Sequence, residues 1–193
     1  MFNSTFNSSN IVQQNSTFSF NPSNNFQQHS TSSTMQQPPF GTLTIGKAAP
    51  AFKGLDQNGE AISLKDFVGK NVVIYFYPKD DTPTCTAQAC NLRDNYTNLI
   101  QDGFEIIGIS PDPVTKHKKF ENKYELPFAL VADEDHSIAE KYGVWGTKKF
   151  MGKVYDGIHR TTFLIDDKGK IKNIISKPNA KNHADEILAA WYE

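Results

Sequence analysis

Two cysteines, Cys85 and Cys90, are the residues of this chain whose type and spacing most directly suggest chemistry. The pair is too small for the disulfide framework of a secreted domain, and its spacing differs from the C-x-x-C of disulfide reductases. A metal site is disfavoured, because C-x4-C supplies two ligands and no histidine cluster stands nearby. From the cysteines alone, redox chemistry and an inert pair of small buried side chains are equally good interpretations.

The residues before Cys85 predict that its sulfur lies at the positive end of a helix. Pro83 suits the first helical position, because a proline there gives up no hydrogen bond. Pro83 also disfavours a helical backbone at Thr82, which fits an N-cap. Cys85 then falls at the third helical position, where free N–H groups and the helix dipole favour a thiolate over a thiol.

A helix N-terminus alone does not make Cys85 an efficient redox nucleophile. Fuller ionisation of a thiol at neutral pH gains only about thirty-fold in thiolate, and the lower basicity erodes part of that gain. Donors must therefore also stabilise the charge that develops on a leaving atom. The hydroxyl of Thr82 is one candidate donor, and an arginine guanidinium is the natural second one.

Cys90 lies about 140° around a regular helix from Cys85, so the two sulfurs cannot face each other there. A disulfide requires Cβ atoms within about 4.5 Å. If the pair bonds, the helix must unwind between the two cysteines. Thr84, Thr86 and Gln88 give that turn no exceptional helix preference.

The surrounding pattern alternates between strands and helices from Gly41 onward, which predicts an α/β fold with a central mixed sheet flanked by helices. Asn58-Gly59 predicts an N-terminal hairpin. The cysteines follow a buried-type strand over 71–77, at the carboxyl edge of the sheet, where α/β proteins usually place their sites. Further strands are predicted over 104–109, 128–131, 161–165 and 171–175, and helices over 83–103, 113–124, 137–142 and 184–191.

The composition changes near residue 40. Residues 1–40 contain no charged residue, and 26 of them are Asn, Gln, Ser or Thr, with phenylalanines spaced among them. Such a segment buries too little apolar surface to offset its chain entropy. We therefore expect a disordered low-complexity tail over 1–40, solvated rather than self-associating, and one folded domain over 41–193.

Charge and hydropathy exclude several classes of function. A net charge of −1 predicts no basic surface for nucleic acid or for an anionic membrane. The longest apolar run, 72–77, is too short to span a bilayer. The tail has neither the pattern of a secretory signal nor the arginines of a transit peptide. We expect a cytoplasmic protein, with the nucleus or an organelle as alternatives.

Several separate motifs, in order along the chain, resemble those of the peroxiredoxins. Pro78-x-x-x-Thr82-x-x-Cys85 is similar to their active-site signature. The spacing to Cys90 and the following Leu92-Arg93-Asp94 resemble the subgroup called bacterioferritin comigratory protein, or PrxQ. The resemblance covers about residues 43–193, and its further segments are 46–52, 109–112, 126–128, 142–145, 149–152 and 159–166.

The resemblance implies a thioredoxin-like fold and a thiol peroxidase that reduces hydrogen peroxide and organic hydroperoxides. Cys85 matches the peroxidatic cysteine, which becomes a sulfenic acid, and Cys90 matches the resolving cysteine, which condenses with it to an intramolecular disulfide. Thr82 matches the threonine that positions the peroxide, and Pro83 the proline that shields the site. Arg160 matches the arginine beside the thiolate.

The resemblance also implies partners and leaves alternatives. Thioredoxin, or a thioredoxin-like protein, would reduce the disulfide in antioxidant defence, with no metal or other cofactor, because sulfur carries both electrons. A monomer is expected, since both cysteines lie in one chain. Thr84 and Gln88 depart from the Gly and Glu of many relatives, and Gln88 costs the arginine a carboxylate partner. A redox sensor acting through Cys85 and a role for the tail are the alternative functions.

Overall fold

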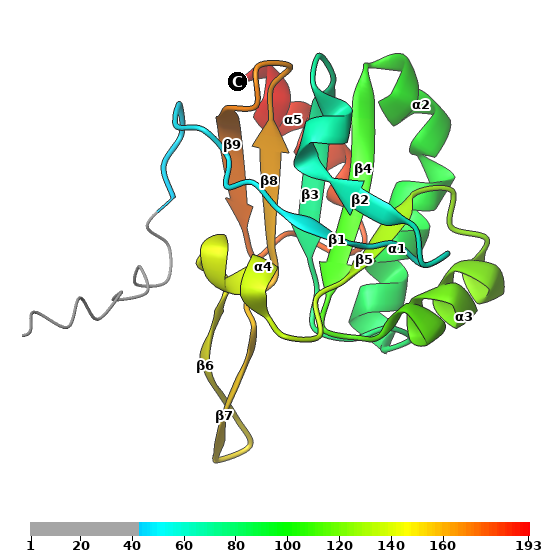
Figure 1. Ribbon diagram of the computed structural model, residues 1–193, viewed down its shortest axis with the longest axis vertical. Helices are drawn as coiled ribbons and strands as arrows, with labels where there is room; N and C mark the ends of the chain where they lie inside the picture. Colours follow the sequence, from blue (N-terminus) through cyan, green and yellow to red (C-terminus); the bar gives the residue numbers. More distant parts are fainter. Residues whose placement is uncertain (1–42) are drawn as a thin grey trace, which may run out of the picture. The chain divides into compact units, whose positions relative to one another are not determined.

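The computed structural model describes residues 43–193, and the predicted low-complexity tail over 1–40 lies outside the described residues (Figure 1). The main sheet has seven strands in the order β2-β1-β5-β4-β3-β8-β9. Its strands are β1 (Lys53–Leu55), β2 (Ala61–Ser63), β3 (Asn71–Phe76), β4 (Phe104–Ser110), β5 (Ala129–Ala132), β8 (Thr161–Ile165) and β9 (Ile171–Ser176). Strands β6 (Trp145–Phe150) and β7 (Lys153–Ile158) form a separate hairpin. The helices are η1 (Leu64–Phe67), α1 (Pro83–Asp94), α2 (Tyr96–Gln101), α3 (Val114–Tyr124), α4 (Ser137–Lys141) and α5 (His183–Tyr192).

Strand β3 lies between β4 and β8 and fixes where the candidate site forms. It pairs in parallel with β4 and antiparallel with β8, so that Phe76 at its end pairs with Ile109 of β4 and with Thr161 of β8. Residues 72–76 are buried, as expected for a β-branched and aromatic run that is covered on both faces. Segments from both neighbouring strands therefore meet at the carboxyl end of β3.

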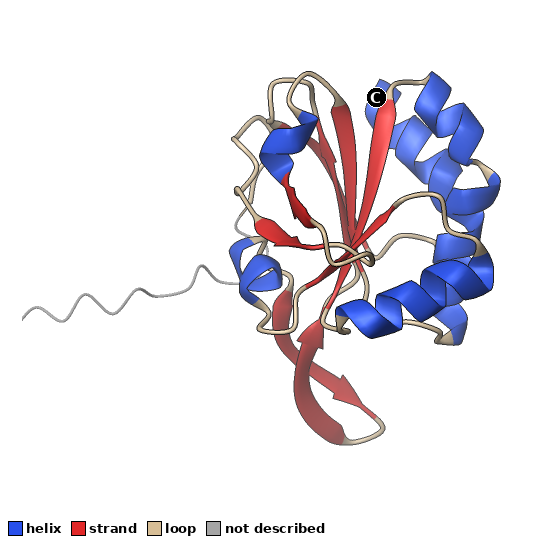
Figure 2. Cartoon of the chain, turned by 45° about the vertical axis from the view of Figure 1, so that its right-hand side comes forward, coloured by secondary structure: helices blue, strands red, loops and turns tan. Residues whose placement is uncertain are grey.

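Helices cover both faces of the main sheet (Figure 2). On one face, α1, α3 and α5 bring Leu92, Phe120 and Ile187 into one cluster with Val73 and Tyr75 of β3. On the other face, α4 and η1 pack against the alternate side chains of the same strand, because successive strand residues point to opposite faces. The predicted mixed sheet flanked by helices is confirmed.

The N-terminal hairpin is also confirmed. β1 and β2 pair antiparallel, with Leu55 opposite Ala61, and the predicted Asn58-Gly59 turn lies between them. Gly59 has a φ of +80°, a backbone conformation that glycine adopts without strain. The hairpin joins the main sheet through a single register position, Leu55 opposite Ala132 of β5.

The prediction of one helix over 83–103 is wrong in one respect. The segment forms two helices, α1 and α2, which are separated at Asn95. The Asn95 backbone has φ −105° and ψ 9°, and its side-chain amide donates to the carbonyl of Asn91 at 2.9 Å. Asparagine competes in this way for helix backbone groups, which explains why the apolar periodicity continues while the helix does not.

The β6–β7 hairpin was not predicted from the sequence. It projects beyond the start of β8 in Figure 1, and its strands pair from Trp145 opposite Ile158 to Phe150 opposite Lys153. Its turn residues, Met151 and Gly152, both have positive φ. That is the geometry of a tight type I′ turn, but Met-Gly is not one of the residue pairs that mark such a turn in a sequence.

No helix within residues 43–193 is both long and apolar enough to cross a bilayer.

Candidate active site

Cys85 lies where the sequence places it, at the third position of α1. Thr82 is the N-cap, with an extended backbone (φ −94°, ψ 151°), and Pro83 is the first helical residue. The Thr82 hydroxyl does not cap the helix but donates to the carbonyl of Lys79 at 3.1 Å, which closes the loop that precedes α1. The side chain of Cys85 is only 2% exposed, whereas Pro83 is exposed at the helix start.

Arg160 supplies the cation that the sequence argument required. It lies between the end of β7 and the start of β8, and the pairing of Thr161 with Phe76 places it beside the start of α1. Its Nη2 donates to the sulfur of Cys85 at 3.1 Å. Helix N-terminus and guanidinium therefore both favour a negative charge on this sulfur.

Gln88 gives Arg160 a second anchor. The Nη1 of Arg160 donates to the Oε1 of Gln88, one turn along α1 from Cys85. From the sequence, Gln88 was expected to deprive the arginine of a partner, because its side chain lacks a carboxylate. An amide oxygen takes that place instead and accepts the same bond.

A buried histidine completes the contact on the far side of Gln88. The Nε2 of Gln88 lies 3.1 Å from Nδ1 of His183, and Nε2 of His183 lies 2.9 Å from Oγ1 of Thr162. Both His183 and Thr162 are fully buried. Burial, with a smaller contribution from the Arg160 cation, lowers the pKa of His183 from 6.5 to about 3. The ring is therefore neutral under physiological conditions.

Sequence reasoning missed His183 and Thr162. They come together with Gln88 across 95 and 74 positions of the chain. His183 lies outside every motif of the resemblance, and Thr162 lies within the segment 159–166 but was given no role there. A single histidine at the start of an amphipathic helix carries no local signal of this role. Only the packing of α1 against α5 and β8 reveals it.

Lys148 of β6 brings a second cation to the site. Its Nζ donates to the carbonyl of Ile158 at 2.8 Å. Partial burial, and then the positive charge of Arg160, lower the pKa of Lys148, while the charge of Cys85 raises it. The ammonium group therefore lies within electrostatic range of both residues. It was missed because its hairpin was not predicted.

A buried acidic residue holds the loop between β3 and α1. Asp80 accepts a hydrogen bond from the hydroxyl of Tyr77 at 2.7 Å and lies 2.7 Å from Nδ1 of His117. Its own backbone N–H donates to Asp112 at 2.6 Å. These bonds join the loop to the start of α3, and so they fix the approach to Thr82.

Cys90 is half-buried on α1, and both cysteines are free thiols. The residues that follow it anchor the rest of the helix. Asn91 bonds to the carbonyl of Lys181 and accepts from the N–H of Ala184, and Arg93 donates to the carbonyl of Tyr124 at 2.7 Å. Arg93 thereby ties α1 to the end of α3, and its guanidinium also pairs with the exposed carboxylate of Asp94 at 2.7 Å.

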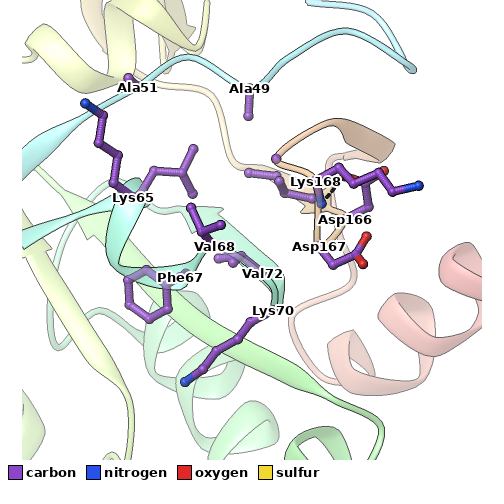
Figure 3. Close-up of a pocket in the computed structure, with 13 residues that line it drawn as sticks. Ala49, Ala51, Lys65, Phe67, Val68, Lys70, Val72, Asp166, Asp167 and Lys168 are labelled. Carbon is purple, nitrogen blue, oxygen red and sulfur yellow. Dashed lines mark hydrogen bonds between the residues drawn. The ribbon is translucent and has the colours of Figure 1, made fainter.

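A pocket of about 240 Å³ lies elsewhere, at the opposite edge of the sheet (Figure 3). It is lined by Val72 at the start of β3 and Ile165 at the end of β8, whereas Cys85 follows the other end of β3. The charged ends of Lys65 and Lys70 point away from its centre. The pocket is therefore separate from the cysteine site. Within residues 43–193, no cluster of His, Cys, Asp and Glu is arranged to hold a metal ion.

Comparisons with known proteins agree on one family. The sequence model described as the AhpC/TSA family matches residues 45–174. The peroxiredoxin Bcp of Escherichia coli is 50% identical over 146 residues, which cover 76% of this chain and 94% of that protein. The structure of the peroxidoxin BcpB of Mycobacterium tuberculosis superposes with a TM-score of 0.69 at 32% identity, covering 78% of this chain and 97% of that one.

A further solved structure is that of the bacterioferritin comigratory protein of Xanthomonas campestris, which was described for its alkyl peroxide reduction activity. It has a TM-score of 0.69 at 33% identity and covers 73% of this chain and 90% of that chain. The thioredoxin-like fold predicted from the sequence is confirmed by these likenesses.

Proposed function

Because this chain belongs to the AhpC/TSA family, and within it to the Bcp/PrxQ peroxiredoxins, it is a thiol peroxidase, and we propose that Cys85 is its peroxidatic and Cys90 its resolving cysteine. The observation that carries the assignment of Cys85 is the bond of 3.1 Å from Arg160 Nη2 to its sulfur. The other cysteine, on the same helix, has no such cation bonded to its sulfur within residues 43–193.

In the first step, the Cys85 thiolate attacks one oxygen of a peroxide. An S–O bond forms, the O–O bond breaks, and sulfur is oxidised by two electrons to a sulfenic acid. The leaving oxygen takes up a proton and departs as an alcohol, or as water when the substrate is hydrogen peroxide. Arg160 and Lys148 place positive charge where negative charge moves from sulfur to oxygen, which lowers the barrier electrostatically.

Thr82 and Pro83 serve this step by position. Because the Thr82 hydroxyl donates its hydrogen to the carbonyl of Lys79, its oxygen retains lone pairs that can accept from the O–H of a hydroperoxide. Pro83 stands exposed at the mouth of the site and limits the access of water to a sulfur that is 2% exposed. Hydrogen peroxide and organic hydroperoxides are the proposed substrates.

In the second step, the Cys90 thiolate attacks the sulfur of the Cys85 sulfenic acid. An S–S bond forms, the S–O bond breaks, and the oxygen leaves as water after protonation. Five positions separate the cysteines, so α1 must unwind between them before the sulfurs meet. A thioredoxin-like dithiol then returns two electrons and two protons, and its own cysteines form a disulfide. Resolution within one chain requires no neighbour, so we propose a monomer.

A coupled assay tests the assignment. Purified chain, thioredoxin, thioredoxin reductase and NADPH are mixed with cumene hydroperoxide or hydrogen peroxide, and NADPH oxidation is followed. We expect turnover for the wild type and none for Cys85→Ser. Turnover that survives Cys85→Ser would refute the role of Cys85. If peroxide oxidises Cys85 but no dithiol reductant supports turnover of peroxide, the result would favour a redox sensor that acts through Cys85 instead.

A further inference from the structure

The hydrogen bonds around Gln88 can run in only one direction. Arginine is a donor without acceptors, so the oxygen of the Gln88 amide must face Arg160 and its NH₂ group must face His183. Nδ1 of His183 then accepts, the ring proton lies on Nε2, and Nε2–H donates to Thr162. The orientation of one neutral imidazole therefore fixes the amide that holds Arg160 against Cys85.

Gln88 also lies within the segment that must change for resolution. Only residues 86–89 separate the two cysteines, and Gln88 is the member of that segment whose side chain bonds to other elements, Arg160 and His183. The next residues are anchored independently, through Asn91 to the start of α5 and Arg93 to the end of α3. Unwinding between the cysteines must therefore break the bonds of Gln88, but it can leave the helix from Asn91 onward in place.

We propose that the contact between Gln88 and His183 is a latch on α1, with His183 as a positioning residue for the peroxidase reaction. While the latch is closed, it holds Arg160 against Cys85 and favours attack on the peroxide. The latch must open before Cys90 can attack the Cys85 sulfenic acid, form the S–S bond and release the oxygen as water. The inference rests on the proposed roles of the two cysteines.

A latch predicts opposite effects on the two chemical steps. Loss of the His183 contact frees the Gln88 amide to rotate, so Arg160 loses its fixed orientation and the first step slows. The same loss removes bonds that oppose unwinding, so the second step becomes faster. A residue that only stabilises the fold would not separate the two rates in this way.

The test measures the two steps separately by rapid quenching, alkylation of free thiols and mass spectrometry. Loss of the Cys85 thiol in a Cys90→Ser background reports the first step, and loss of the Cys90 thiol at saturating hydrogen peroxide reports the second. For His183→Leu we expect a first step about ten-fold slower and a second step about three-fold or more faster, as for the loss of one hydrogen bond between neutral groups. A second step that is unchanged or slower would overturn the latch.

Two further variants keep the test decisive if His183→Leu folds poorly. Thr162→Val removes the acceptor of Nε2–H with little change in volume, and it should shift both rates in the same directions by smaller factors. His183→Asn retains an oxygen that can accept from Gln88 and should restore the first step. Asn173→Ala is the matched control. It removes the hydrogen bond of 2.8 Å from the Asn173 side chain on β9 to the carbonyl of Ala190, at the far end of α5, and it should change neither rate.

A spectroscopic readout is independent of peroxide. In ¹⁵N-labelled protein, the ring of His183 should carry its proton on Nε2, and Gln88→Glu should move a proton to Nδ1, because a carboxylate only accepts. A wild-type ring protonated on Nδ1 would refute the direction of the bonds. If wild-type Cys85 does not react with peroxide at all, the proposed function fails; if it reacts and the His183 variants do not split the rates, only the latch fails.

Discussion

The Nη2 of Arg160 lies 3.1 Å from the sulfur of Cys85, although 75 positions separate the two residues in the chain. The antiparallel pairing of β8 with β3 produces this contact, because Thr161 lies opposite Phe76 at the edge where α1 begins. A cation from one element and a helix N-terminus from another thus act on the same atom. The guanidinium also donates to Gln88, so its position is fixed from two sides of the helix turn.

Arg160→Met should slow the reaction of Cys85 with peroxide by about ten- to a hundred-fold, since hydrogen bonds to charged groups contribute about 1.5–3 kcal/mol. The rate of Arg160→Lys should lie between those of the wild type and Arg160→Met, because one ammonium cannot donate in a fixed fork to both Cys85 and Gln88. The rate is measured by stopped-flow mixing with hydrogen peroxide. Arg93→Met is the control, because Arg93 binds the carbonyl of Tyr124 and should leave this rate unchanged. Equal rates for Arg160→Met and the wild type would contradict the proposed role.

Cys90→Ser should leave the first reduction of peroxide almost intact and remove the intramolecular disulfide. The reason is spatial: the cation and the helix start surround Cys85, while Cys90 lies farther along α1. Intact mass spectrometry after one equivalent of peroxide should show a loss of two hydrogens in the wild type and a gain of one oxygen in the variant. Two free thiols in the oxidised wild type would count against Cys90 as the resolving residue.

The sequence was sufficient to predict those parts of the fold that depend on residues close together in the chain. Pro83 at a first helical position, the buried run over 72–76 and Asn58-Gly59 in its turn each fix a short stretch of backbone, and the structure has all three. The position of Cys85 relative to α1 follows from Pro83 alone. Arg160 could be assigned from the sequence only through the family resemblance, because nothing near it in the chain points to Cys85.

The rest depends on contacts between distant segments. His183 and Gln88 meet only because α5 packs beside α1, and Lys148 reaches the site on a hairpin whose Met151-Gly152 turn carries no recognisable signal. The break at Asn95 was hidden for a different reason. The apolar periodicity continues across it, while a side-chain bond to Asn91 ends the helix.

Asp80→Asn should destabilise the fold and slow the peroxidase, whereas Asp81→Asn should do neither. Asp80 is buried, and its two oxygens contact Tyr77 and His117, so an amide there leaves one acceptor oxygen where two are used. Such a change costs about 1–3 kcal/mol. Asp81 is exposed and paired with Lys123, where ion pairs contribute little, and asparagine tolerates its positive φ. Urea unfolding and the coupled assay on both variants compare adjacent positions directly. Similar losses for the two variants would refute the role given to Asp80.

His183 should make the fold less stable as pH falls below neutral. Burial lowers its pKa to about 3, so the folded protein keeps the ring neutral at pH values where the unfolded chain, with an ordinary pKa of 6.5, takes up a proton. The unfolded state thus binds more protons between these two values, and the free energy of unfolding falls by up to about 1.4 kcal/mol per pH unit. Urea unfolding at about pH 7 and about pH 5 should show the wild type losing about 2 kcal/mol more than His183→Asn, which has no group that titrates there. Subtracting the variant cancels the contributions of all other titrating groups. Equal losses in the two proteins would mean that His183 is charged in the folded state, and the direction of bonds from Arg160 through Gln88 to Thr162 would then be wrong.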